Sequence, residues 1–545
     1  MRNLSHTVIR PFVHNLLWLP LTVLLSCSTP DKTSYDLVIS GTNIHTLDTA
    51  QSTGSIAWIG IKDGRIAALG TRDDALPEAN LVLQANEDHV YPGFIDAHGH
   101  LFGYAESLHT VNLFGTSSVE ECIERIEAFI AANPEKEWII GRGWDQNDWP
   151  GKAYPSAKDL DRFSQKKLFL TRIDGHAAWV NTNVMKAFTI EEGMRISGGS
   201  VLDGILIDQA ESLVQLPSRD NSFWRIALLQ TQDSLAKYGI TAMTDAGLHY
   251  EQILLLDSLI TEGKWLIPIN AMISNTEEDL AYFEKNGPIE KPLLRVKSVK
   301  AYLDGALGSR GALLRAPYHD LPQHYGLPLL SPLELDRLRD RCLNNGWQLC
   351  VHAIGDSAHH VLLKSFDELD RTEDLRFRVE HAQIMTPEDS AYYRHPNIIP
   401  SVQPTHATSD MYWAAERLGE HRLHHSYSYK RILNASGLIA LGTDFPIEHI
   451  DPLATFFSAT TRKDRSQWPE AGFIPEQALS PLETLRGMTV EASYAAFTEH
   501  HYGAIAIGQL ANFTIVNQDL LSRIPVQQGD TKVVRTIVQG RVMYP

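Results

Sequence analysis

The feature that most constrains the fold is a repeated order of apolar strand, polar loop and helix between residues 93 and 500. The strand candidates are Leu168–Arg172, Thr241–Thr244, Val296–Leu303, Gln348–Ala353, Arg376–His381, Ile398–Val402 and Leu438–Thr443. The helix candidates are Ser118–Ala131, Phe223–Tyr238, Leu333–Asn345 and Ser357–Leu369. Strands and helices that alternate in this way indicate parallel strands joined by crossover helices. We therefore expect an α/β fold, a (β/α)8 barrel with its chemistry where the strands end in loops.

Strand-like sequence flanks the barrel region on both sides. Residues 35–92 show β-type alternation with a turn at Lys62-Asp-Gly64, and residues 503–545 contain further short apolar runs. Two β-rich ends around an α/β middle predict that both termini meet in one small β-sandwich, beside a barrel domain of residues 93–502. Residues 103–225 are more than one strand–helix unit needs, so we expect an inserted cap or substrate domain there.

Charge and cysteine content exclude some functions. The formal net charge of −18 argues against nucleic acid or an anionic membrane surface as the main partner, because both would repel the chain. Four cysteines in 545 residues are too few and too scattered for a disulfide framework. We interpret Cys342 and Cys350 as buried thiols.

The first 34 residues are expected to lie outside the fold. Arg2 and Arg10 precede an apolar run that is too short for a membrane span but typical of a signal peptide. The ending Leu24-Leu-Ser-Cys27 resembles a bacterial lipobox, which implies cleavage before Cys27 and a lipid on that residue. We predict a signal peptide at 1–26, a tether at 27–34, and an exported protein anchored by lipid in the cell envelope or periplasm. The alternative is an uncleaved anchor with an incidental cysteine.

The segment Tyr91-Pro-Gly-Phe-Ile-Asp-Ala-His-Gly-His100 ends in two histidines one residue apart. On an extended backbone, His98 and His100 point to the same side and form a chelating pair. Neutral imidazole is a preferred ligand of zinc and similar ions. The pair alone is weak evidence, because 23 histidines in the chain produce such spacings by chance.

Four later strand ends each carry a residue of the ligand type, namely Lys300, His352, His381 and Asp444. Each has an ordinary structural reading: a histidine can be a hydrogen-bonded core residue, Asp444 can cap a helix, and Lys300 can pair with Asp304. Independent structural residues, however, have no reason to recur at the same end of successive strands. With the histidine pair they predict a hydrolytic site for a divalent metal, with zinc preferred.

Several motifs then identify the relatives of this sequence. They are Pro92-Gly-Phe-Ile-Asp-Ala-His-Gly-His100, Gly141-Arg-Gly-Trp-Asp145, Asp174-Gly-His-Ala-Ala-Trp-Val-Asn181, Lys300-Ala-Tyr-Leu-Asp-Gly305, Val351-His-Ala-Ile-Gly-Asp356, Glu380-His-Ala382, Ser401-Val-Gln-Pro404 and Leu441-Gly-Thr-Asp-Phe-Pro446. The chain resembles the amidohydrolase superfamily, in its YtcJ-like branch (amidohydrolase family 3), which includes N-substituted formamide deformylases. The resemblance covers nearly everything after residue 35. One departure, Ala511-Asn-Phe513 where relatives commonly read Ala-Asp-Phe, lies in the predicted sandwich.

The resemblance implies that Lys300 is carboxylated by carbon dioxide and bridges two divalent ions. A carbamate is an anionic oxygen ligand, whereas an ammonium group cannot bind a cation. The implied ligands are His98, His100 and Asp444 for one ion and His352 and His381 for the other. With an unmodified Lys300 the site would hold one ion, and the sequence does not decide between the two.

The reaction that the resemblance implies is hydrolysis of an amide-type C–N bond in an N-acyl or N-formyl amine. Metal-activated hydroxide would attack the carbonyl, while Asp444 accepts the water proton and delivers it to the leaving amine. The alternatives are a deaminase or ester hydrolase of the same superfamily, or a noncatalytic lipoprotein that binds a metabolite or metal. The noncatalytic alternative predicts a missing ligand or a missing Asp444, and neither is missing.

Candidates for substrate contact are His176, Arg310, Asp304 and Trp144. His176 would bind a substrate oxygen or serve the structure. Arg310 would hold a substrate carboxylate or pair with Asp304. Trp144 would line an apolar pocket or belong to a core. The expected partners are a small amide, no nucleic acid, a membrane only through the lipid, and, as an open option, a second copy of the chain.

Overall fold

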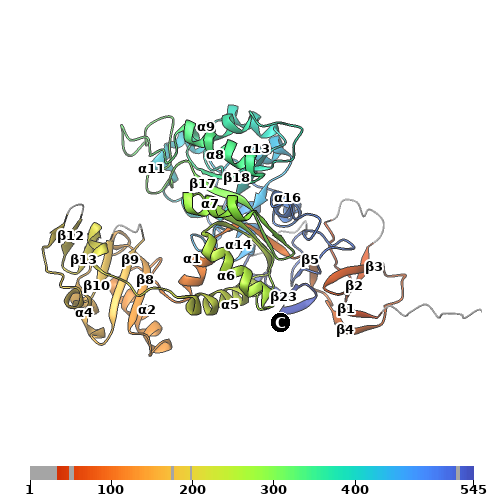
Figure 1. The fold of residues 1–545 in the computed structure, drawn as a ribbon, viewed down its shortest axis with the longest axis horizontal. Coiled ribbons are helices and arrows are strands. Elements are labelled where there is room, and N and C mark those ends of the chain that lie inside the picture. The colour runs from red at the N-terminus through yellow and green to blue at the C-terminus, as the bar shows by residue number, and fades with distance from the viewer. Residues whose placement is uncertain (1–33, 48–54, 174–176, 197–198, 523–527) are drawn as a thin grey trace, which may run out of the picture.

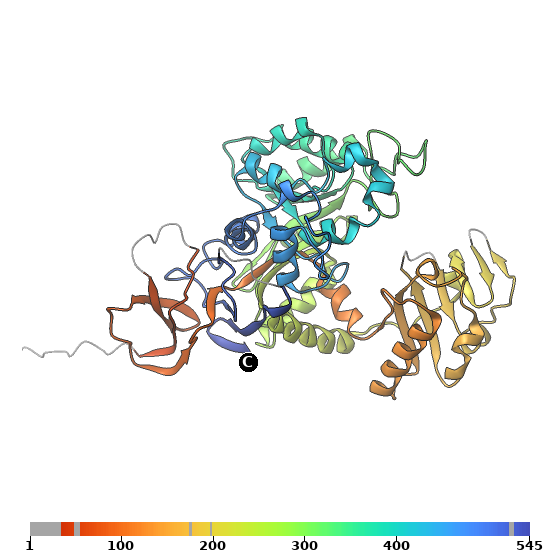
Figure 2. The same cartoon turned by 180° about the vertical axis from the view of Figure 1, so that it is seen from behind.

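The computed structural model describes residues 34–47, 55–173, 177–196, 199–522 and 528–545. Three parts are visible: a central α/β barrel, a β-rich domain on one side of it, and two small sheets on the other (Figures 1 and 2). The chain enters through the small sheets, forms the first barrel strand, leaves for the β-rich domain, and returns to complete the barrel.

The barrel contains eight strands that pair in parallel with their neighbours. In spatial order they are β6 (Phe94–Gly99), β14 (Ile240–Leu248), β15 (Ile269–Ser274), β17 (Leu294–Tyr302), β18 (Gln348–Ala353), β19 (Phe377–His381), β20 (Ile398–Val402) and β21 (Ala440–Leu441). A short strand, β16 (Ile289–Lys291), pairs antiparallel with β17. The predicted (β/α)8 barrel is confirmed.

The seam between the last and first strands closes at the predicted ligands. The backbone N–H of Asp444 donates to the carbonyl of His98 at 2.8 Å, and the N–H of His100 donates to the carbonyl of Phe445 at 2.7 Å. The backbone hydrogen bonds that join the two ends of the barrel sheet therefore also fix the spacing of three candidate ligands.

Helices cover the outside of the barrel (Figure 1), and their ends follow from local sequence. Helix α8 (Pro332–Asn345) begins with a capping box between Ser331 and Glu334 and ends at Gly346, which adopts φ +63°. Proline at the first helical position and a glycine with left-handed backbone angles after the last position are common signals for the start and the end of a helix. The other main barrel helices are α5 (Asn221–Lys237), α6 (Tyr250–Thr261), α7 (Glu277–Asn286), α9 (Asp356–Phe366), α13 (Tyr429–Ser436), α14 (Pro452–Thr461), α15 (Pro481–Gly487) and α16 (Val490–Ala495).

Two strand predictions differ from the structure. Leu168–Arg172 falls in strand β9 (Lys167–Arg172), which belongs to the β-rich domain rather than to the barrel. The third barrel strand, β15, was not predicted. Pro268 and the polar Asn270 interrupt its apolar run, but Asn270 is buried and accepts a hydrogen bond from Arg295 at 3.1 Å. A buried polar residue with a tertiary partner leaves no periodic signal in the sequence.

The β-rich domain is inserted between α1 (Leu101–Ser107) and α5. Its sheet has seven strands in the spatial order β11-β12-β13-β10-β9-β8-β7. Along the sequence, the first of these strands is β7 (Val111–Asn112) and the last is β13 (Ile205–Asp208). The other strands are β8 (Trp138–Trp144), β10 (Ala177–Val180), β11 (Arg195–Ile196) and β12 (Gly199–Leu202), and the helices are α2 (Val119–Ala132), α3 (Ala157–Leu160) and α4 (Thr182–Ala187). The sheet has its own apolar core, separate from that of the barrel.

The two small sheets combine both ends of the chain. One has the order β3-β2-β1-β4 and the other β24-β23-β22-β5. Their strands are β1 (Tyr35–Ser40), β2 (Ile56–Lys62), β3 (Arg65–Thr71), β4 (Ala79–Gln84), β5 (His89–Pro92), β22 (Phe513–Val516), β23 (Val533–Val538) and β24 (Arg541–Tyr544). Strand β5 pairs antiparallel with β22, and the sheets share one core that includes Ile39, Ile61, Val90, Phe513 and Ile537. We call this part the sandwich.

The predicted signal peptide, Cys27 and the tether up to residue 33 lie outside the described residues. Within the described ranges, the model contains no helix with the length and apolarity that a bilayer crossing requires. Cys342 and Cys350 are buried free thiols, as predicted.

Candidate metal centre

His98, His381 and Asp444 form a buried group at the C-terminal ends of the barrel strands, and we call it the barrel cluster. One side-chain nitrogen or oxygen of each lies within 4.8 Å of those of the other two. His98 comes from β6, His381 from β19, and Asp444 follows β21. Because parallel strands end at the same rim, three residues far apart in sequence meet there.

His100 and Lys300 complete the group near β6. His100 Nε2 lies 3.1 Å from Asp444 Oδ1, and Lys300 Nζ lies 3.4 Å from His98 Nε2. Lys300 is 1% exposed, and this burial lowers the pKa of its amine. A buried lysine whose pKa is lowered is easier to convert into an uncharged nucleophile, as reaction with carbon dioxide requires. Among the described residues Lys300 forms no ion pair with Asp304, and its Nζ contacts His98 instead.

His352 lies beside His381, with ring centroids 4.4 Å apart. Burial and the charge of Lys300 lower the pKa of His352 to about 3, and burial together with His352 holds the pKa of His381 far below its usual value. Both rings are therefore neutral at pH 7 and keep a lone pair for a cation. His381 Nδ1 interacts with Gln403 Oε1 at 2.8 Å, which leaves Nε2 free to turn to the site.

Buried side-chain atoms without hydrogen bonds indicate whether this group of residues is suited to bind a metal ion. His352 Nε2 and Asp444 Oδ1 are both buried, and neither forms a hydrogen bond of good geometry with the described residues, although Asp444 Oδ1 lies 3.1 Å from His100 Nε2 and His352 Nε2 lies 3.6 Å from Asp304 Oδ1. Buried polar atoms without partners are costly, and a bound cation removes that cost. A set of imidazole nitrogens and a carboxylate is the usual donor set for zinc. The residues present therefore fit a divalent metal.

Asp444 is held in a strained backbone conformation. Its φ is +63°, and His381 has φ +72°. Such values are uncommon outside glycine and cost energy that the surrounding fold must supply. Asp444 does not cap the following helix, because the N-cap of α14 is Asp451. The strained residues His381 and Asp444 instead both place a ligand atom in the barrel cluster.

A buried ion pair orients His98. His98 Nδ1 lies 2.6 Å from Glu380 Oε2, and Arg378 Nε donates to Glu380 Oε1 at 2.6 Å. Arg378 also donates to the carbonyl of Ala97 at 2.7 Å and to Ser401 Oγ at 2.8 Å. Burial alone would raise the pKa of Glu380, but Arg378 and His98 hold it well below its usual value. Glu380 thus fixes the His98 ring with Nε2 facing the site.

Sequence reasoning assigned no role to Glu380 or Arg378, although Glu380 stands in a recognised motif. The available signal was the Arg-x-Glu spacing within the otherwise apolar strand β19. Residues two positions apart on a strand face the same side, so Arg378 and Glu380 could have been predicted to form an internal ion pair.

His406 is a second residue that sequence reasoning missed. It lies on α10 (Pro404–Asp410), with Nε2 3.1 Å from Asp444 Oδ2 and Nδ1 3.4 Å from Glu448 Oε1. Burial would lower the pKa of His406, but the two carboxylates raise it well above the usual value. Its position just after the Ser401-Val-Gln-Pro404 motif was the available signal.

Two aspartates at the rim were also missed. Burial raises the pKa of Asp245 on β14 to about 6, and its Oδ2 accepts a hydrogen bond from the N–H of Leu101 at 2.7 Å. Asp245 Oδ1 is buried and has no hydrogen-bond partner among the described residues. Burial likewise raises the pKa of Asp96 to about 6, and Asp96 binds the hydroxyl of Thr443 at 2.6 Å. Asp96 thereby fixes the turn that precedes Asp444.

Asp304 organises a loop and does not face substrate. Its carboxylate accepts hydrogen bonds from the backbone N–H groups of Leu313 (2.8 Å), Ile354 (3.0 Å) and Gly355 (2.8 Å), and it is fully buried. Burial raises its pKa to about 7. The substrate role assigned to Asp304 is not supported by this geometry, because its oxygens are occupied by backbone donors.

Arg310 pairs with Asp320 rather than with Asp304. Arg310 Nε and Nη2 donate to the two carboxylate oxygens of Asp320 at 3.2 and 2.8 Å. Arg417 also donates to Asp320, which ties the loop after β17 to α11 (Ala414–Leu418). The expected pairing with Asp304 is therefore not formed, because a carboxylate ten residues away engages the guanidinium, and no motif indicated that partner. A contact between Arg310 and a substrate carboxylate stays a prediction.

Trp144 belongs to the core of the inserted domain. It is fully buried, packs near Trp149 and Trp179, and donates from Nε1 to the carbonyl of Leu170 at 2.6 Å. Of the two readings, the core reading holds and the substrate-pocket reading does not. His176 lies outside the described residues.

A cavity of about 400 Å³ opens beside the cluster at the ends of β14, β15 and β17. Its lining residues are Gly247, His249, Ser274, Asn275, Thr276, Lys300, Tyr302, Leu329 and Leu330. A larger cavity, of about 570 Å³, lies in the inserted domain among residues such as Met185 and Ile190. Only the first adjoins a candidate ligand, so we take it as the substrate cavity.

Comparisons with known proteins identify the family of this chain. A family model described as "Amidohydrolase family" matches residues 82–544. The chain is 27% identical to the putative amidohydrolase YtcJ of Bacillus subtilis, over 84% of this chain and 89% of that protein. It is 24% identical to the N-substituted formamide deformylase of Arthrobacter pascens, over 93% of this chain and 98% of that protein.

A solved structure of a metal-dependent hydrolase has a similar fold. An uncharacterized metal-dependent hydrolase from Pyrococcus horikoshii superposes with a TM-score of 0.75 at 25% identity, over 90% of this chain and 99% of that one. The agreement extends over the barrel and the additional sheets, because nearly the whole of both chains is aligned.

Proposed function

We propose that this chain, which belongs to the amidohydrolase family and is a metal-dependent hydrolase, cleaves the amide-type C–N bond of an N-acyl or N-formyl amine. The observation that carries the proposal is the barrel cluster, in which ligand atoms of His98, His381 and Asp444 converge beside a buried Lys300. The similarity to an N-substituted formamide deformylase supports the choice of substrate class.

The residues that would hold metal fall into two sets. His98, His100 and Asp444 would hold one ion, and His352 and His381 a second. Carboxylation of Lys300 would supply the bridging anion, and its position 3.4 Å from His98 Nε2 supports that role. A bound zinc ion would polarise the substrate carbonyl and lower the pKa of a water molecule.

Asp444 is proposed as the proton carrier. Its Oδ1 is buried beside His100 Nε2, 3.1 Å away, and forms no hydrogen bond of good geometry among the described residues, so this oxygen can accept the proton of the attacking water. Oδ2 is held by His406 at 3.1 Å, which keeps the carboxylate in one orientation while the proton moves to the leaving amine nitrogen. His406 acts by positioning Asp444.

The cavity favours a small, weakly charged acyl group. Apart from Lys300 and His249, its lining consists of glycine, hydroxyl, amide, aromatic and leucine side chains. Asp320 already engages Arg310, the candidate for holding a substrate carboxylate. A neutral amide therefore suits this cavity better than a substrate with a free carboxylate.

The test is a substrate panel on the purified chain after reconstitution with zinc and bicarbonate. The panel contains an N-formyl amine, an N-acetyl amine, a simple ester and an aminopurine, which separate amide hydrolysis from esterase and deaminase activity. We expect turnover of the first two with release of the amine. Deamination of the purine alone, or no turnover at full metal loading, would contradict the proposal.

Metal content decides the form of the centre. About two zinc equivalents per chain in the barrel would support a carboxylated Lys300, and about one would indicate an unmodified lysine. Less than a few tenths of an equivalent, not restored by added zinc, would support a noncatalytic binding protein instead.

We also propose that the protein is exported and carries a lipid anchor on Cys27. Because its formal net charge of −18 would be repelled by an anionic membrane surface, we expect the lipid to be its only contact with such a membrane. Replacing Cys27→Ser should shift the protein from the membrane fraction to the soluble fraction. Retention in the membrane fraction would instead support an uncleaved hydrophobic anchor.

A further inference from the structure

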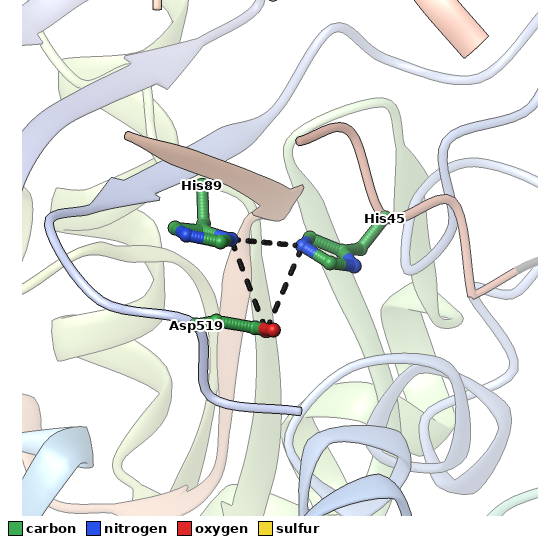
Figure 3. A group of neighbouring side chains, drawn as sticks. All are labelled: His45, His89 and Asp519. Carbon is green, nitrogen blue, oxygen red and sulfur yellow. Dashed lines mark hydrogen bonds and ion pairs between the residues drawn. The ribbon is translucent and has the colours of Figure 1, made fainter. Parts of the chain in front are cut away.

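A second group of two histidines and an aspartate lies in the sandwich (Figure 3). His45 follows β1, His89 is the first residue of β5, and Asp519 lies in the loop after β22. We call this group the sandwich cluster. No motif singles out these residues, and none of them takes part in the barrel centre.

The three side chains are spaced for one ion. His45 Nε2 lies 3.1 Å from His89 Nδ1, and these two atoms lie 3.9 and 3.8 Å from Asp519 Oδ1 (Figure 3). A triangle with these sides has a centre about 2.1 Å from each corner, which is the length of a zinc bond to nitrogen or oxygen. The side chains need little movement to bind a cation together.

Neighbouring groups hold the ligands in place. The N–H of His45 donates to the carbonyl of Val90 at 2.9 Å, and the His45 ring stacks on Tyr91 at 4.5 Å with planes 6° apart. The hydroxyl of Tyr91 donates to Asp519 Oδ1 at 3.1 Å, and the N–H of Leu521 donates to the same oxygen at 2.9 Å. Partners that orient ligands in this way are typical of metal sites.

The protonation states also suit a metal. Burial lowers the pKa of His45 and of His89, which favours the neutral imidazole that a cation needs. Two neutral rings 3.1 Å apart share at most one N–H between the facing nitrogens, and a cation can replace that proton. The side chains of His45, His89 and Asp519 are 21%, 16% and 36% exposed, so water can supply a fourth ligand.

We propose that His45, His89 and Asp519 bind a divalent transition-metal ion of the zinc type that fastens the two ends of the chain together. Two ligands come from the N-terminal part of the sandwich and one from the C-terminal part, more than 400 residues later. An ion bound by all three crosslinks segments that are otherwise joined by strand pairing and apolar contacts. The site is structural and independent of the proposed hydrolysis.

The first test compares zinc content and stability in variants of the full chain. His45→Phe keeps a ring that stacks on Tyr91 but removes the donor atom, and His500→Phe is the matched control because the side chain of His500 is 90% exposed. After zinc loading and dialysis, His45→Phe should hold one equivalent less than the parent, and His500→Phe should hold the same amount. Zinc should also raise the unfolding midpoint of chelator-treated parent more than that of His45→Phe.

Equal zinc content in the parent and in His45→Phe would overturn the proposal. If the variant fails to fold, crystals of the unaltered chain soaked in zinc give the answer by anomalous scattering at the zinc edge. A peak between His45, His89 and Asp519 supports the site, and a peak at the barrel cluster alone overturns it. Hydrolysis by His45→Phe should match the parent, so loss of this site and loss of the barrel function are distinguishable.

Discussion

The barrel cluster and the sandwich cluster consist of the same residue types, yet their surroundings differ. In the barrel, the side chains of His98 and Asp444 are 0% and 7% exposed, a buried ion pair orients His98, and Asp444 Oδ1 lies 3.1 Å from His100 Nε2 without a hydrogen bond of good geometry. In the sandwich, the three side chains are 16% to 36% exposed, and neutral groups orient them. Buried unpaired atoms are expected where chemistry occurs, whereas a half-exposed, satisfied group suits a crosslink.

The largest difference should appear when the same substitution is made in both clusters. Asp444→Asn removes the proposed proton carrier, so kcat/KM for an N-formyl amine should fall by about 10²–10⁴-fold while much of the metal stays bound. Asp519→Asn should leave kcat/KM within about twofold because it is remote from the barrel rim. Steady-state kinetics and elemental analysis on both variants check this. Equal losses in the two would erase the distinction between the clusters.

The groups that orient the histidines give the next largest effect. Glu380→Gln should weaken metal binding in the barrel by about 10–100-fold, because it loosens His98 and leaves Arg378 without its charge partner. Tyr91→Phe removes a hydroxyl that donates to the Asp519 carboxylate and accepts from the N–H of Leu520, and a hydrogen bond to a charged group contributes about 1.5–3 kcal/mol. Competition with a chelator measures both. Unchanged barrel affinity in Glu380→Gln would show that the ion pair serves stability alone.

The pH dependence of stability should follow the buried carboxylate. Arg378 and His98 hold the pKa of Glu380 below its ordinary value of 4.5, so its contribution to stability is complete above about pH 4.5 and is lost as the pH falls further. The difference in unfolding midpoint between the parent and Glu380→Gln should therefore shrink below pH 4.5. Scanning calorimetry from pH 7 to pH 3 checks this, and a constant difference would contradict it.

The smallest effect on activity should come from a residue outside both clusters. Trp144→Phe removes the hydrogen bond to the carbonyl of Leu170 and should cost the inserted domain about 1–3 kcal/mol. KM for the amide substrate should not change, because Trp144 lies in a core remote from the cavity beside Lys300. A severalfold rise in KM at full folding would restore the pocket role that the structure does not support.

The barrel and the convergence of its candidate ligands were predictable because the repeat of strands and helices fixes which residues share a rim. His98, Lys300, His352, His381 and Asp444 each end or follow a barrel strand, so their convergence follows from topology. The strand β15 escaped prediction because the partners of its buried Asn270 are distant in sequence. Helix boundaries were predictable where caps are local, as at Ser331 and Gly346.

Residues on loops were predicted poorly because their partners depend on how two loops meet. Arg310 binds Asp320, and Asp304 binds three backbone groups of neighbouring loops, and neither pairing has a fixed spacing. His406 reaches Asp444 from a helix after β20 for the same reason. The sandwich cluster was invisible in the sequence, since its ligands are separated by 44 residues in one case and by several hundred in the other.

The pairing of β5 with β22 also bears on how a ribosome-bound chain matures. The strand partner of β5, β22, emerges only after the whole barrel and the inserted domain have been translated, which takes roughly a minute at usual synthesis rates. During that interval the edge of β5 and the apolar face of the first sheet have no covering strands from the C-terminal part. The apolar face of the first sheet therefore stays uncovered until residues 513–545 have been synthesised, so the sandwich can close only at the end of translation.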